Sequence, residues 1–130
     1  MNIERYINDD GEFRCFVVDN TKVSRNGMTK MVSSISGVTV TKYPRFFDDD
    51  IFCEFTFKEH YFIIEEPYGD NTTFDVVAPE NGLEAFNEIA NFFENATPLR
   101  SGDWGYNTLF LMRIVLAGII FIGVVIWFSN

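Results

Sequence analysis

The chain has 130 residues, 19 acids against 10 bases, a net charge of −9 and two cysteines. Its hydrophobic fraction of 47% and aromatic fraction of 17% exclude intrinsic disorder, which requires low hydrophobicity. The acidic balance argues against a nucleic-acid partner, because phosphate neutralisation needs clustered Lys and Arg, and two cysteines are too few for a disulfide framework or a four-ligand zinc site.

The first part of the chain predicts a strand, a helix and a second strand. Residues 12–19 are rich in β-branched and aromatic types between polar flanks, which is typical of a strand. Apolar residues recur at i, i+3, i+4 and i+7 over 28–35 and predict a short amphipathic helix. Asn26 is its candidate N-cap and Gly37 its C-terminal stop. Residues 38–41 alternate valine with threonine and predict the second strand.

Three further strands follow. Residues 51–57 show the clearest period-two pattern in the chain. A tight turn at Glu59-His60 leads into a strand over 61–66, and the turn sequence of 67–71 leads into another over 73–78. Nesting the first hairpin about Glu59-His60 places Glu54 opposite Glu65, and like charges directly opposite are destabilising. Either a β-bulge breaks this register, or a cation or a partner's base neutralises the pair.

The last element of the domain is a helix. Asn81 and Glu84 match a capping box, and apolar residues continue along one helical face to Phe93. Four to five strands joined mostly by hairpin-length loops, with two helices, predict an α+β fold built on a small antiparallel sheet. We place this domain at residues 1–97 and a short linker at 98–105.

A long apolar segment follows the linker. Residues 108–128 contain a single charge, and 21 residues at about 1.5 Å each span the roughly 30 Å hydrocarbon core of a bilayer. A domain of about 100 residues could hardly enclose a helix that is apolar on every face. We therefore predict a transmembrane helix over 106–128 and a tail at 129–130.

The orientation follows from what has to cross the membrane. The start of the chain is charged and lacks the apolar core of a signal peptide. Moving two C-terminal residues across the bilayer costs far less than moving a folded domain. We expect a single-pass, tail-anchored protein with its N-terminal domain in the cytoplasm, in a bacterial inner membrane or an organellar membrane, the bacterial inner membrane being favoured.

Catalytic signals are weak. The chain lacks the common phosphate-binding, dinucleotide-binding, zinc-protease and serine-hydrolase motifs. His60 lies in a predicted turn, where a histidine is usually just exposed, and Cys15 and Cys53 lie within predicted strands, where thiols are usually buried and inert. We predict a protein that is not an enzyme and has no cofactor or metal.

Two surfaces of the domain are candidates for binding a partner. The run Asp48, Asp49 and Asp50 belongs to the acidic segment 46–103, which holds 14 acids and two bases and is either a solvated face or a docking surface for a basic partner. The second face of the predicted hairpin carries Phe52, Tyr61 and Ile63. If this face is uncovered, it is an apolar patch of the kind that marks protein interfaces.

Arg113 is the third candidate. A charge at the centre of a spanning helix costs about 2.5–3.5 kcal/mol. Arg113 lies near the cytoplasmic end, where its side chain either reaches the lipid headgroups or pairs with an acid or a carbonyl on another protein's helix.

Together these features favour an accessory or assembly subunit of a larger membrane protein complex, whose partners are the bilayer and an integral membrane protein. Two alternatives remain. One is an immunity protein that neutralises a membrane-active toxin, because an acidic domain suits a basic toxin. The other is a membrane-proximal enzyme in which His60 or the carboxylates converge in a pocket.

Overall fold

The computed structural model describes residues 1–45, 50–67, 72–80 and 83–100. These residues form six strands and two helices. In chain order the elements are β1 (Ile3–Ile7), β2 (Phe13–Asp19), α1 (Arg25–Ser33), β3 (Val38–Lys42), β4 (Ile51–Phe57), β5 (His60–Glu65), β6 (Thr73–Val77) and α2 (Leu83–Asn95).

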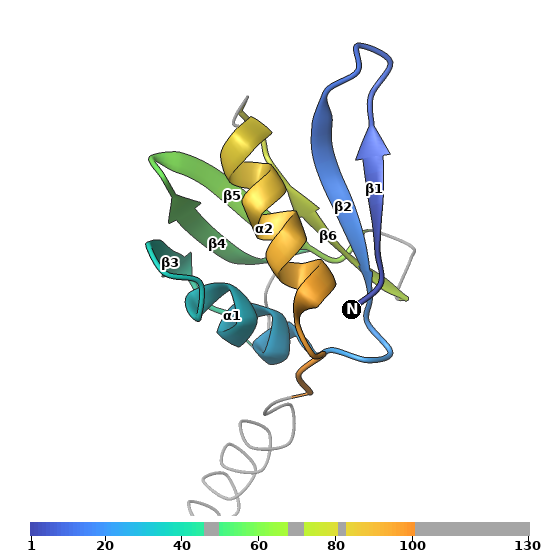
Figure 1. Ribbon diagram of the computed structural model, residues 1–130. Coiled ribbons are helices and arrows are strands. Elements are labelled where there is room, and N and C mark those ends of the chain that lie inside the picture. The colour runs from blue at the N-terminus through green and yellow to red at the C-terminus, as the bar shows by residue number, and fades with distance from the viewer. Residues whose placement is uncertain (46–49, 68–71, 81–82, 101–130) are drawn as a thin grey trace, which may run out of the picture.

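The strands form one sheet with the order β1-β2-β6-β5-β4-β3, and every neighbouring pair is antiparallel. Both helices pack on the same face of this sheet (Figure 1). The prediction of four to five strands is wrong, because β1 adds a sixth strand at the edge.

The sequence pattern did not predict β1, because the composition of this strand is that of a charged surface segment. Glu4 and Arg5 interrupt the apolar residues of IERYI, and strand propensity is a weak signal at a sheet edge. Arg5 nevertheless lies on the helix side, where its guanidinium donates hydrogen bonds to Asn87 and Asn91 of α2 and pairs with Glu94. These contacts hold the edge strand against α2.

Stacked phenylalanine rings fill the space between the sheet and α2. Phe86 of α2 lies 5.4 Å from Phe16 of β2 and 5.8 Å from Phe62 of β5, measured between ring centroids. Phe55 stacks on Phe62 at 5.3 Å, and all four rings are fully buried. Aromatic pairs at these separations contribute about 0.5–1.5 kcal/mol beyond the burial of their surface.

The first helix begins differently from the sequence-based expectation. Its N-cap is Ser24 and not Asn26: the Ser24 hydroxyl accepts a hydrogen bond from the Gly27 backbone N–H at 3.0 Å. Met28, Met31 and Val32 are buried beneath the helix, as their spacing predicts. The cap of α2 involves residues 81–82, which lie outside the described residues.

The turn between β4 and β5 sets the register of the central hairpin. Lys58 and Glu59 have φ values of +50° and +66°, the backbone conformation of a two-residue turn that matches the twist of its strands. Phe57 therefore pairs with His60, and Glu54 pairs with Ile63. The predicted turn at Glu59-His60 is wrong, and so is the predicted pairing of Glu54 with Glu65.

The chain that leaves α2 passes directly over α1. A Cβ atom added to Gly27 would lie 1.7 Å from the carbonyl oxygen of Leu99. Only a residue without a side chain allows this approach between the two backbones. The segment after α2 therefore contacts the domain as far as Leu99, within the stretch predicted as a linker.

None of the helices in the described part of the chain has the length and hydropathy needed to cross a bilayer. The predicted transmembrane segment, with Arg113, lies outside the described residues.

The contact at Gly27 makes a substitution there unfavourable. An exposed Gly→Ala change inside a helix usually gains up to about 1 kcal/mol. In Gly27→Ala, steric conflict with Leu99 of the order of 1–3 kcal/mol should outweigh that gain. We expect faster trypsin cleavage after Arg100 and a lower free energy of unfolding for the detergent-solubilised chain.

Asn26→Ala, one residue earlier in α1, is the matched control and should leave both measurements nearly unchanged. A Gly27→Ala chain that is more stable and equally resistant to trypsin would show that Leu99 does not rest on α1.

Candidate functional site

The face of the sheet opposite the two helices is the strongest candidate site. We call it the outer face. None of the described elements packs on it, and its side chains alternate along each strand with the buried residues of the core (Figure 1). The register of the six strands aligns these side chains in rows across the sheet.

One row is mainly apolar. Tyr6, Cys15, Val77 and Ile63 follow one another across β1, β2, β6 and β5, and we call these four residues the apolar row. Glu54 and then Lys42 continue this line on β4 and β3, and the Lys42 Nζ donates to the carbonyl oxygen of Ile51 at 2.5 Å. Tyr6 is 50% exposed, and the other three residues of the apolar row are half-buried.

The adjacent row carries most of the acids. Glu4 of β1 pairs with Val17, Val17 with Asp75, and Asp75 with Glu65 of β5. We call Glu4, Asp75 and Glu65 the acidic row. The carboxylates of Asp75 and Glu65 therefore lie directly opposite each other, and like charges in this position destabilise an antiparallel pair of strands. Partial burial, followed by the charges of Asp75 and Asp50, raises the pKa of Glu65.

The structure separates the residues that the sequence predicted as one partner-binding patch. Tyr61 and Ile63 lie on the outer face, where Glu54 accepts a hydrogen bond from Tyr61; burial, followed by this bond, raises the Tyr61 pKa. Phe52 does not lie there. A bulge between Ile51 and Cys53 turns Phe52 into the core, where its ring lies 5.0 Å from Phe74.

Of the predicted acidic run of three aspartates, the structure describes only Asp50. The Asp50 carbonyl accepts a hydrogen bond from the Glu66 backbone N–H at 2.9 Å, which joins the start of β4 to the end of β5. Asp48 and Asp49 lie outside the described residues, as does Arg113.

The cysteines and the histidine do not form a catalytic pair. Cys53 is fully buried on the helix side of the sheet, whereas Cys15 lies on the outer face. His60 begins β5, opposite Phe57. Desolvation raises the pKa of Cys15 to about 12 and that of Cys53 to about 11, so both thiols are protonated at neutral pH.

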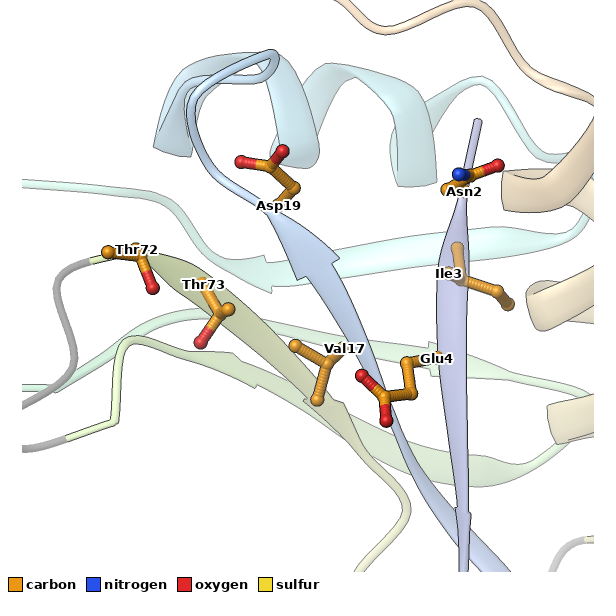
Figure 2. A pocket seen from close by; sticks show the side chains of 7 residues that line it. All are labelled: Asn2, Ile3, Glu4, Val17, Asp19, Thr72 and Thr73. Atoms are coloured by element: carbon orange, nitrogen blue, oxygen red, sulfur yellow. The ribbon is translucent and has the colours of Figure 1, made fainter.

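A groove of about 550 Å³ lies at one end of the outer face, between β1, β2 and β6. Figure 2 shows Glu4, Val17 and Thr73 from these three strands lining it, with Asp19 at the end of β2. The Asp19 carboxylate accepts a hydrogen bond from the Thr21 backbone N–H at 2.8 Å, and bonding to Thr21 lowers the Asp19 pKa. Within the described residues, no three acidic, cysteine or histidine side chains gather closely enough to hold a metal ion.

The outer face was only partly visible in the sequence. The alternation of residues 12–19 and 73–78 contained Cys15, Val17, Asp75 and Val77, but a pattern within one strand does not name its neighbours. Asp75 lies opposite Glu65 because β6 joins β2 to β5 in the sheet.

Comparisons with known proteins found no matching family model, no similar curated protein and no similar solved structure.

The pKa values of the thiols predict slow alkylation. Relative to free thiols of pKa 9.0, the thiolate fraction at pH 7 falls by roughly three orders of magnitude for Cys15 and two for Cys53. We expect both cysteines to react with a thiol reagent far more slowly in the native chain than in urea. Single variants Cys15→Ala and Cys53→Ala assign each rate, and a fast native reaction at either position would instead indicate a nucleophilic cysteine.

The raised pKa of Glu65 predicts that the ionised side chain lowers the free energy of unfolding in a pH-dependent way. A folded-state pKa above the unfolded value means that the folded chain holds the proton more tightly. This loss of stability is absent below the ordinary pKa of a glutamate. It develops as the pH rises from that value and is complete above the folded-state pKa. Glu65→Gln should therefore be more stable than wild type at pH 7, by up to about 1 kcal/mol, and equally stable at pH 4.

Glu84→Gln in the first turn of α2 is the control, because a carboxylate there interacts favourably with the helix dipole and its removal should not stabilise the chain. Equal effects of Glu65→Gln at both pH values, measured by urea unfolding, would show that Glu65 and Asp75 do not repel each other.

Proposed function

We propose that this protein is a non-enzymatic, membrane-anchored accessory or assembly subunit whose domain binds a partner protein through the outer face. The observation that carries the proposal is the apolar row. An antiparallel sheet with one face in water usually alternates apolar residues inside with polar residues outside. Tyr6, Val77 and Ile63 depart from that pattern on a face that no described element covers.

Two features of the chain support the membrane anchor. The sequence of residues 108–128 is apolar and long enough to span a bilayer. The contact between Leu99 and Gly27 leaves only a few residues between the domain and this segment. A partner that binds the outer face would therefore be held close to the membrane.

The chemistry of the described residues gives less support to an enzyme. Both thiols have raised pKa values, and the two cysteines lie on opposite sides of the sheet. His60 pairs with Phe57 across the hairpin and not with a carboxylate.

Site-specific photo-crosslinking in native membranes tests the proposal. A benzophenone amino acid at Tyr61 reports on the outer face, and the same amino acid at exposed Glu84 reports on the helix side. We expect a single adduct with an integral membrane protein from position 61 and none from position 84. Equal adducts from both positions, or none from either, would contradict the proposed binding face.

The variant Arg113→Leu separates the accessory subunit from the toxin-neutralising alternative. Loss of the adduct in Arg113→Leu is expected for an integral subunit whose helix contacts the partner. An immunity protein would tolerate this substitution and would form an adduct at position 61 only when its toxin is supplied.

A further inference from the structure

We propose that the outer face binds a cationic amphipathic helix of the partner protein. This inference rests on the proposed function and specifies the chemistry of the partner. The helix would place its apolar side on the apolar row and its lysines or arginines beside the acidic row. The shape of the face, the spacing of its rows and its charge favour such a helix.

The shape of the site favours a helix. A segment that binds as an added strand needs a free sheet edge, and the edges here are β1 and β3. The apolar row instead crosses the middle of the sheet over β1, β2, β6 and β5. A sheet face is buried by another layer, and an amphipathic helix is the smallest element that supplies one.

The spacing of the two rows also suits a helix. Val77 and Asp75 are two residues apart on β6, and Ile63 and Glu65 are two apart on β5, so the rows are about 6.6–6.8 Å apart. An α-helix with its side chains is about 10–12 Å across. An amphipathic helix that lies along the apolar row can therefore rest its apolar side on that row and place lysines or arginines from its flank beside the acidic row.

The charge of the face favours a basic helix. Glu4, Asp75 and Glu65 form the acidic row, Glu54 continues the line of the apolar row on β4, and Lys42 follows on β3. Glu65 and Asp75 repel each other while partly buried, so a neighbouring ammonium or guanidinium would relieve a cost that the free domain carries. An acidic helix would add to this repulsion, and a purely apolar one would remove both carboxylates from water without supplying an opposite charge.

Binding of a defined peptide to the full chain in mild non-ionic detergent tests the inference. The probe is an 18-residue amphipathic helix of leucine and lysine, and its partner probe replaces each lysine with glutamate. We expect the lysine peptide to bind at least tenfold more tightly than the glutamate peptide. The double variant Glu65→Gln, Asp75→Asn should weaken that binding at least tenfold.

A matched control separates a specific site from general attraction to an acidic protein. The double variant Asp9→Asn, Asp10→Asn changes the net charge by the same amount at the exposed turn between β1 and β2. It should alter the affinity less than twofold. Equal weakening by both double variants would overturn the inference.

A second measurement does not depend on any variant folding. A spin label on the lysine peptide should broaden the methyl resonances of Val17, Ile63 and Val77 in the wild-type chain and leave those of Met28 and Ile89 sharp. Broadening on the helix side instead would overturn the inference. If Tyr61 crosslinks to a membrane partner but the lysine peptide does not bind, the partner is not a cationic helix, and only the proposed function remains.

Discussion

The register of the β4–β5 hairpin is the constraint on which the rest of the structure depends. Side chains alternate between the two faces of a strand, so a slip of one residue would exchange the core residues with those of the outer face. The turn at Lys58-Glu59 fixes this register through two non-glycine residues with positive φ, each of which costs of the order of 1–3 kcal/mol. The burial of the Phe55 and Phe62 side chains, together with their stacking, offsets that cost. The β4–β5 register pairs Glu54 with Ile63, and the separate register of β5 with β6 places Glu65 opposite Asp75.

The helices complete a core that the sheet cannot close by itself. α2 covers Phe16 and Phe62, while α1 lies against β3 and β4. Both helices use the same face, and this leaves the apolar row and the acidic row without a described covering layer. Ile63 and Val77 are half-buried on this face.

Local patterns predicted most elements of this fold, and non-local contacts account for the errors. Residues 51–57 alternate and residues 28–35 have helical spacing because each segment buries one of its faces. Such a pattern lies within the segment itself, so the sequence predicts the element. β1 was not predicted because Arg5 lies on the helix side of the sheet. Its guanidinium is held there by hydrogen bonds to asparagines about 80 residues away in the chain. Phe52 was assigned to the outer face because strict alternation has no means of anticipating the bulge at Ile51 and Cys53. The predicted pairing of Glu54 with Glu65 was wrong: Glu54 pairs with Ile63, and the carboxylate that faces Glu65 is that of Asp75.

The route of the chain after α2 links the outer face to the segment that follows it. Leu99 crosses α1 at Gly27, and α1 lies on the helix side of the sheet. Both described helices and the segment at Leu99 therefore lie on the helix side of the sheet. If the following apolar segment spans a bilayer, the protein uses opposite sides of one small sheet for two tasks. The helix side would then guide the chain toward the membrane, and the outer face would stay available to a partner. Gly27 permits the close approach on the helix side, because any side chain at that position would displace the backbone of Leu99 from α1.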